Sequence, residues 1–336
     1  MIDALKELAE MADALGGLNW VQGPGGNVSV KTDTSELWVK ASGVRLADTS
    51  SEHGHVRVPL DLARRALAGD AEAEARLFSY APRPSLETYF HALDGRVVAH
   101  THPVGLLLAA CSACPPELGL AAEVGWVRYI RPGRGVAVAM QAILRADADE
   151  QVIVLQSHGV VAIAGSAKRA IALTQEIDAR ARAAFHPQEE FAGLVARYVD
   201  AVIELPGGVM SWLPQRPRTA EDTVPRYLFP DAVICASVTR VDSLREAAST
   251  ASRALDLLGR ASVLVDPEGK RVIIARNESQ LRQSIEVAAA HDWIEDALIR
   301  QGSPLYLEPG EPARLLNLPS EQYRIRLASH AGSTSC

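Results

Sequence analysis

Two apolar runs that each end in histidine constrain this chain more than any other feature. One run ends Val98-Ala99-His100-Thr101-His102, and the other is Val152-Ile153-Val154-Leu155-Gln156-Ser157-His158. Side chains at i and i+2 of a strand point to the same face, so His100 and His102 can bind one cation together. If the runs are neighbouring strands, His158 joins them, and three neutral ligands with an open position are typical of catalytic zinc. Alternatively, His-x-His is a coincidence and each ring is a satisfied polar residue near the core.

Length and charge exclude several classes of protein. A chain of 336 residues forms one large domain or two of ordinary size. The net charge of -7 and the absence of a long basic run argue against nucleic acid as a partner, although a small anionic ligand remains compatible. No apolar stretch reaches the roughly 20 residues of a membrane span, and the charged N-terminal segment differs from a signal peptide. We therefore expect a cytoplasmic protein without a membrane partner.

The periodicity of apolar residues predicts an α/β domain with several antiparallel strands, because the turns between strands are short. Helices are expected at residues 2–15, 60–68, 86–93 and 167–184, and strands at 27–31, 37–40, 56–58, 97–102, 126–130, 152–157 and 160–164.

Prolines concentrate after residue 205, which predicts a domain at 1–205, a linker at 206–224 and a smaller α/β unit at 225–336. Within the last unit, we expect strands at 232–236, 262–265 and 271–275, a hairpin turn at 266–269 and a helix at 278–300. This unit contains no recognisable ligand cluster, and His291 and Asp292 are expected on a solvated helix face.

Two glycine-containing turns are candidate anion sites. Gly26 precedes a predicted strand and permits close approach of the backbone to an anion, while Asn27 and Ser29 add side-chain donors. Ser42 and Gly43 follow the next predicted strand and offer a hydroxyl and an N–H group. The two turns could hold one phosphate or carboxylate, or they could be turns without a ligand.

A proline-initiated helix carries a candidate acid/base. In Pro84-Ser85-Leu86-Glu87, Ser85 can cap the helix and Glu87 falls in its first turn. Glu87 is either a carboxylate stabilised by the helix dipole or a general acid/base beside the metal. His91 lies four residues on and shares its face. It is a competing fourth ligand, a hydrogen-bond partner of Glu87 or a core residue, and we favour the last two.

The four cysteines suggest no redox function. Cys111 and Cys114 form a C-x-x-C, but two prolines follow it and an apolar helical segment precedes it. A thioredoxin-like motif begins a helix instead of ending one. Packing is therefore favoured over a redox or zinc role.

The motifs in their order resemble the class II aldolase/adducin family over about residues 1–200. They are Gly26-Asn27-x-Ser29, Ser42-Gly43, Pro84-Ser85-x-Glu87, His100-x-His102 and His158-Gly159. The resemblance implies a three-layer α/β/α domain with a largely antiparallel central sheet. It also implies a homo-oligomer, commonly a tetramer with sites at subunit interfaces.

The same resemblance implies roles for the motif residues. His100, His102 and His158 would hold a divalent metal, with zinc expected and Mn²⁺, Co²⁺ and Fe²⁺ as alternatives. Glu87 would move protons at the carbon next to the substrate carbonyl. The substrate phosphate would be held by Gly26, Asn27, Ser42, Gly43 and Ser85.

The expected activity is that of a metal-dependent lyase on a ketose, ketose phosphate or hydroxy-keto acid, acting through a metal-stabilised enediolate. A sugar-phosphate epimerase, a decarboxylase, a non-haem iron oxygenase and a non-enzymatic module like adducin remain alternatives. Leu86 stands where the family's aldolases usually have a second hydroxyl residue, which removes a phosphate donor. Ser157 stands where asparagine often precedes the third histidine.

Overall fold

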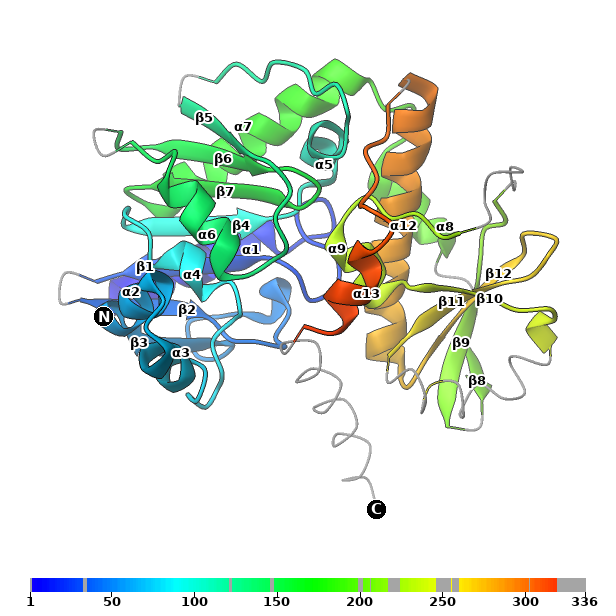
Figure 1. The fold of residues 1–336 in the computed structure, drawn as a ribbon, viewed down its shortest axis with the longest axis horizontal. Helices are drawn as coiled ribbons and strands as arrows, with labels where there is room; N and C mark the ends of the chain where they lie inside the picture. The colour runs from blue at the N-terminus through cyan, green and yellow to red at the C-terminus, as the bar shows by residue number, and fades with distance from the viewer. Residues whose placement is uncertain are drawn as a thin grey trace. The chain divides into compact units, whose positions relative to one another are not determined.

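The computed structural model describes residues 2–32, 35–120, 123–145, 148–198, 202–205, 207–216, 224–245, 255, 260–301 and 303–318. The chain forms two compact units, Met1–His186 and Pro187–Cys336 (Figure 1). None of the described helices is both long and apolar enough to cross a membrane.

The first unit is built on a seven-stranded sheet in the order β3-β2-β1-β4-β7-β6-β5. Neighbouring strands are antiparallel except for the parallel pair β5 and β6, so the predicted, largely antiparallel sheet is confirmed. The strands are β1 (Asn27–Lys31), β2 (Glu36–Lys40), β3 (His55–Pro59), β4 (Val97–Thr101), β5 (Glu123–Val127), β6 (Gln151–Leu155) and β7 (Gly159–Ala164).

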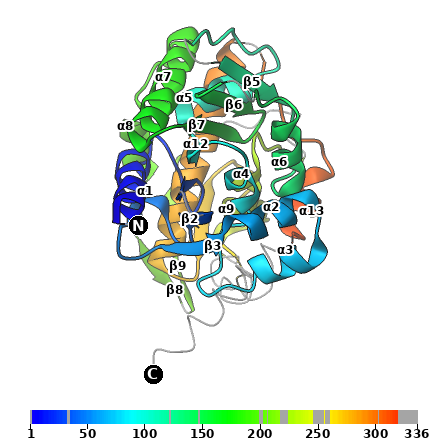
Figure 2. The same cartoon turned by 90° about the vertical axis from the view of Figure 1, so that its left-hand side faces the viewer.

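Helices cover both faces of this sheet, which gives the predicted three layers (Figure 2). One face carries α1 (Ile2–Leu15), α5 (Val104–Ala110) and α7 (Ala167–Phe185). The other carries α2 (Leu60–Ala68), α4 (Thr88–His91) and α6 (Arg134–Gln141), with α3 (Ala71–Leu77) against α2 and a short 3-10 helix, η1 (Leu46–Asp48), beside α1.

The two histidine-terminated runs form buried strands for a simple reason. All residues of β4 and β6 are buried, and most are Val, Ile or Ala, which pack well in a strand covered on both faces. His100 in β4 lies opposite Asn27 of β1 on one side and Val161 of β7 on the other. The middle of the sheet therefore holds the first histidine rigidly.

Several element boundaries in this unit differ from the sequence prediction, and two of the differences have a clear physical reason. Helix α4 spans only Thr88–His91, because the preceding segment pairs in extended form, with Pro84 bridged to Ala41. Strand β5 begins at Glu123, before the predicted 126–130, because its parallel partner β6 pairs with it from that residue on.

The second unit holds a five-stranded sheet in the order β10-β11-β12-β9-β8. Only β10 and β11 are parallel. Its strands are β8 (Ile203–Leu205), β9 (Gly208–Leu213), β10 (Val238–Arg240), β11 (Ser262–Val265) and β12 (Arg271–Ala275). Its described helices are α8 (Phe191–Tyr198), α9 (Pro230–Cys235), α12 (Glu278–Gln301), which packs on β12 and β9, and α13 (Glu311–Leu316).

Two sequence predictions fail in this unit. Gly208–Leu213, inside the predicted linker 206–224, is strand β9 and pairs with β12, so the compact unit begins near Pro187 instead of residue 225. Residues 206 and 217–223 of that range lie outside the described residues. Residues 232–235 of the predicted strand 232–236 lie in helix α9, where Pro230 occupies the favoured first turn. A short apolar run does not distinguish strand from buried helix. The hairpin turn is confirmed, since the Gly269 N–H donates to the Asp266 carbonyl at 3.1 Å.

Candidate metal centre

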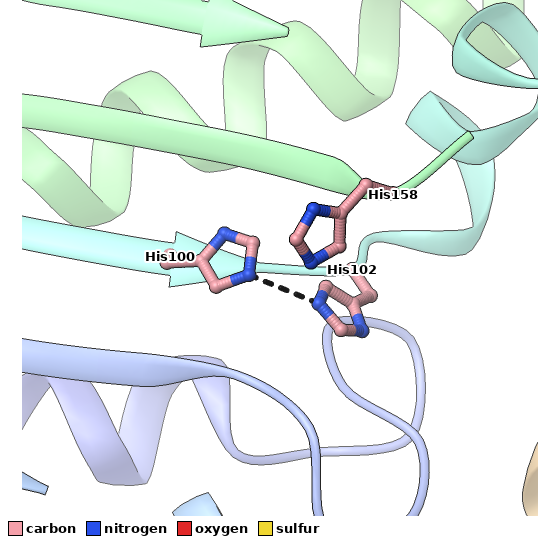
Figure 3. A group of neighbouring side chains, drawn as sticks. All are labelled: His100, His102 and His158. Atoms are coloured by element: carbon pink, nitrogen blue, oxygen red, sulfur yellow. Dashed lines mark hydrogen bonds between the residues drawn. The ribbon is translucent and has the colours of Figure 1, made fainter. Parts of the chain in front are cut away.

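Three histidine rings converge at one end of the central strands of the first sheet (Figure 3). His100 is in β4, His102 follows directly after it, and His158 lies in the turn between β6 and β7. One ring nitrogen of each lies within 4.8 Å of the others, and Nε2 of His100 is 3.1 Å from Nε2 of His102. All three residues are buried. The expected convergence of the rings is confirmed.

The donor set suits a divalent cation. The ring of His100 is oriented by a 2.9 Å contact between Nδ1 and the Val160 carbonyl oxygen, which must accept the proton and leaves the Nε2 lone pair facing His102. Burial lowers the pKa of His100, which favours the neutral ligand form. The buried Nδ1 of His158 has no hydrogen-bond partner among the described residues. The three imidazole rings meet in one buried place, and His100 is in the neutral form. This donor set is therefore suited to bind a divalent metal ion.

The turn that carries His158 depends on its neighbours. A Cβ atom on Gly159 would lie 2.4 Å from the Thr101 carbonyl oxygen and 2.8 Å from the ring of His102, so only glycine permits this approach. Ser157 adopts a left-handed φ of 53°, a conformation that asparagine tolerates better than serine. The backbone strain therefore lies beside the three histidines.

Glu87 lies against the three rings. Its Oε1 is 3.0 Å from His158 Nε2, its Oε2 is 3.6 Å from His100 Nε2, and Asn27 donates to Oε2 at 2.6 Å. Although burial raises the pKa of Glu87, His100 and His158 hold it well below the usual value. Glu87 occupies the position before α4 but makes no capping hydrogen bond. The side-chain carboxylate of Glu87 therefore contacts the histidine rings and Asn27, and it does not cap the helix.

His91 and Ser29 form a buried pair beneath these groups. His91 Nδ1 lies 2.7 Å from the Ser29 hydroxyl, and both residues are fully buried. His91 is outside the three-histidine group, and its Nδ1 bonds to Ser29 and not to Glu87. The core interpretation of His91 is confirmed, whereas the predicted pairing with Glu87 is wrong. Ser29, predicted as a substrate donor, lies in the interior with His91.

The candidate anion turn that contains Ser42 and Gly43 lies beside the segment that contains Ser85. The Ser42 N–H donates to the Arg83 carbonyl at 2.8 Å, so it is already used, and the Ser85 N–H donates to the Lys40 carbonyl at 3.3 Å. Ser85 Oγ accepts the Glu87 N–H at 3.2 Å. Gly43 has a φ of 81° and open space where a side chain would be.

Position 26 also requires glycine. Its φ is 70°, and a Cβ there would lie 2.7 Å from the Val21 side chain. Four strand ends meet at this end of the sheet, namely the end of β2, the start of β1, the end of β4 and the start of β7. The predicted site residues therefore come together from distant segments.

The cysteines contribute no candidate site. Cys111 ends α5 and is buried, which raises the pKa of its thiol, while Cys114 is exposed. Among the described residues, neither belongs to a metal-ligand group. Cys235 forms no disulfide with another described residue, and Cys336 lies outside the described residues.

A second acidic group occurs in the C-terminal unit, where ligand atoms of His291, Asp292 and Glu295 lie close together. Asp292 is buried, so the predicted solvated face is wrong for this residue. It pairs with Arg271 at 2.7 Å and Arg216 at 2.6 Å. Because guanidinium groups already neutralise it, this group does not resemble a metal site. Sequence reasoning missed both arginines because they are distant from α12 along the chain.

Residues 6–185 match the family described as the class II aldolase and adducin N-terminal domain, and the chain belongs to that family. Members of this family depend on divalent metals. No protein of curated function matches the chain.

Three solved structures illustrate the similarity. A class II aldolase domain from Thermoplasma acidophilum is 28% identical and covers 53% of this chain and 92% of its own, with a TM-score of 0.47. A Klebsiella pneumoniae protein described as an aldolase, epimerase or decarboxylase is 21% identical and covers 55% and 90%, with a TM-score of 0.43. L-fuculose-1-phosphate aldolase from Thermus thermophilus is 19% identical and covers 56% and 97%, with a TM-score of 0.41.

Proposed function

We propose that this protein is a zinc-dependent lyase that cleaves or forms a carbon–carbon bond next to a carbonyl in a small polyhydroxylated or anionic substrate. The observation that carries the proposal is one largely buried carboxylate, Glu87, whose oxygens lie 3.0 Å from His158 Nε2 and 3.6 Å from His100 Nε2. His100, His102 and His158 would hold the ion. A bound divalent cation supplies Lewis-acid stabilisation of negative charge on the substrate carbonyl oxygen.

Glu87 removes or returns the proton at the carbon next to that carbonyl. Asn27 donates to Oε2 and thereby fixes the orientation of the carboxylate, while Oε1 faces the imidazoles. A base fixed in this way needs little reorganisation before proton transfer. We assign Asn27 to the positioning of Glu87 in addition to the substrate contact predicted for it.

The two turns hold the anionic or hydroxylated end of the substrate. The Ser42 and Ser85 hydroxyls and the backbone at Gly43 and Gly26 are the proposed contacts. Leu86 contributes no donor, so the site offers fewer hydroxyl groups than a dedicated phosphate loop. We therefore propose that a sugar acid or hydroxy-keto acid is accepted besides a ketose phosphate. By resemblance, the enzyme is a homotetramer.

A retro-aldol screen with metal analysis tests the proposal. The purified chain is assayed for bound zinc and for cleavage of ketose phosphates, ketoses and hydroxy-keto acids. We expect cleavage that chelation abolishes, and a Glu87→Gln variant that keeps its metal but loses turnover. His53, which is exposed, provides the control variant His53→Ala.

Three results would contradict the lyase assignment. Metal-loaded protein that produces only an epimer or carbon dioxide would replace it with one of the alternative activities. Oxygen consumption that requires Fe²⁺ would indicate an oxygenase. Protein that retains no divalent metal would remove the basis of all of these activities.

A further inference from the structure

Lys40 is a buried cation that the proposed chemistry does not use. It is the last residue of β2 and only 2% exposed. Its Nζ donates to the Val44 carbonyl at 2.6 Å and to the Ala41 carbonyl at 3.3 Å. These two carbonyls flank Ser42 and Gly43, so one ammonium group closes the turn that contains both.

Lys40 acts from the far side of the sheet. Its neighbour Val39 belongs to the core cluster that includes Phe90 of α4. Successive side chains of a strand point to opposite faces, so Lys40 projects to the face opposite α4. Asn27 and His100 are paired in β1 and β4, and Asn27 contacts Glu87 beside α4. Lys40 therefore influences the site through the backbone and does not contact the substrate.

A chain of hydrogen bonds connects the ammonium group to Glu87. The C=O and N–H of a trans peptide point in opposite directions, so holding the Ala41 carbonyl on Lys40 directs the Ser42 N–H away from it. That N–H donates to the Arg83 carbonyl at 2.8 Å. The carbonyl of Lys40 itself accepts the Ser85 N–H at 3.3 Å.

The last link reaches the candidate base. Ser85 Oγ accepts the N–H of Glu87 at 3.2 Å, and the Glu87 carboxylate lies against His158. The segment that begins α4 is thus attached to the turn that Lys40 closes.

We propose that Lys40 is a positioning residue that fixes the candidate anion turn Ala41–Val44 and the adjacent segment Arg83–Ser85, and through them the backbone of Glu87. The inference rests on the proposed function in one respect, namely that this turn and this segment hold the phosphate or carboxylate group of the substrate. An unclamped turn would have to be ordered by the ligand itself, at a cost in binding affinity.

Lys31 provides a matched control within the same sheet. It is the last residue of the neighbouring strand β1, is also buried, and its Nζ donates to the Gly95 carbonyl. Gly95 lies just before β4, whereas His100 lies near the end of β4. Lys31→Met therefore removes a hydrogen bond from a buried lysine to a backbone carbonyl, like those of Lys40, but at the opposite end of the strands.

The test compares Lys40→Met, Lys40→Arg and Lys31→Met in the full chain by hydrogen exchange, by calorimetric titration with inorganic phosphate and by zinc content. In Lys40→Met, we expect the amides of Ser42 and Ser85 to exchange at least about tenfold faster, as for loss of a charged hydrogen bond. We expect a similar loss of phosphate affinity. Lys40→Arg keeps the positive charge and has N–H donors for both carbonyls, so it restores both properties. Lys31→Met changes neither property. All variants retain zinc.

Several outcomes would overturn the inference. They are unchanged exchange at Ser42 and Ser85 in Lys40→Met, phosphate binding equal to that of Lys31→Met, and failure of the wild-type protein to bind phosphate. If Lys40→Met does not fold, Lys40→Gln, with its shorter side chain, must show the same losses relative to Lys40→Arg. Wild-type protein that binds zinc and phosphate but cleaves no substrate would contradict the lyase proposal and leave the role of Lys40 intact.

Discussion

Each of the two units holds a largely buried carboxylate, but the partners of that carboxylate differ. Glu87 in the first unit faces imidazoles such as His158, whereas Asp292 in the second pairs with Arg271 and Arg216. Although burial raises both pKa values, these partners hold each pKa well below its usual value. The two carboxylates therefore have partners of different chemistry.

The difference lies in whether the neutralising charge is permanent. A guanidinium is always protonated and presents a fork that matches a carboxylate, so Asp292 needs no further cation. Tyr198 also donates to Asp292 at 2.7 Å, which ties α8 to α12. An imidazole is charged only when protonated and, when neutral, offers a lone pair to a metal. A buried acid alone does not identify a site, because the type of its partner decides between support of the fold and chemistry.

The largest expected effect concerns the arginine-paired acid. Asp292→Asn leaves the buried Arg271 without its carboxylate partner, whereas Arg216 keeps Glu295 and Asp296. The loss of this buried ion pair should lower the free energy of unfolding by about 3–5 kcal/mol. Urea denaturation measures this change, and zinc content should stay constant. The exposed pair of Glu268 and Lys270 provides the control, since Glu268→Gln should cause no measurable change. Loss of zinc in Asp292→Asn without loss of stability would invert the comparison.

Removal of one imidazole should have a somewhat smaller effect, mainly on metal affinity. The roughly 10–16 kcal/mol of a four-ligand structural zinc site corresponds to about 2.5–4 kcal/mol per ligand, or roughly a hundredfold to a thousandfold in affinity. We expect a loss of this size for His158→Ala in a zinc competition titration. The exposed His53 again supplies the control. Equal zinc affinity in both variants would remove His158 from the proposed ligand set.

Gly159→Ala tests the close approach that brings the rings together. The added methyl group would overlap the Thr101 carbonyl and the His102 ring, so the cost should be about 1–3 kcal/mol, accompanied by weaker zinc binding. Gly165, just after β7, has open space where a methyl group would be added and serves as the control in Gly165→Ala. Thermal unfolding with and without zinc measures both effects. Two variants of equal stability would contradict the steric argument.

A buried lysine should titrate where a buried arginine does not. Burial, and secondarily Arg64, lower the pKa of Lys31 to about 7, while Asp94 opposes the shift. The unfolded chain binds this proton up to a higher pH, so stability should rise between pH 7 and about 10, with a slope approaching 1.4 kcal/mol per pH unit. Lys31→Met should flatten that slope in urea titrations at several pH values. A wild-type slope that persists in the variant would assign it to other groups.

The smallest effect concerns backbone strain beside the three histidines. Ser157→Asn should raise stability by about 0.5–1 kcal/mol, because asparagine adopts the left-handed φ more readily than serine. Ser166, whose φ of -152° is extended, provides the control in Ser166→Asn. Chemical denaturation distinguishes the two. A gain at both positions would mean that relief of strain is not the cause.

Part of this structure could be predicted from local sequence alone. The apolar runs that end at His102 and His158 predicted two buried strands whose histidines come together at one end of the sheet. The structure confirms the two strands and the position of the histidines. The helix after Ser166 was also predictable, since its apolar residues recur at helical spacing. Short apolar runs were ambiguous, which explains why residues 232–236 were assigned to a strand although residues 232–235 lie in α9.

By itself, the sequence determined which residues alternate, which turns need glycine and which side chains can bind a metal, because these are properties of neighbouring residues. Only the tertiary structure decided that Asn27 donates to Glu87, that Gly159 approaches His102, and that Arg271 pairs with Asp292. The first of these contacts joins residues 60 positions apart. Such pairings depend on how separate strands and helices pack, and no local pattern along the chain specifies that packing.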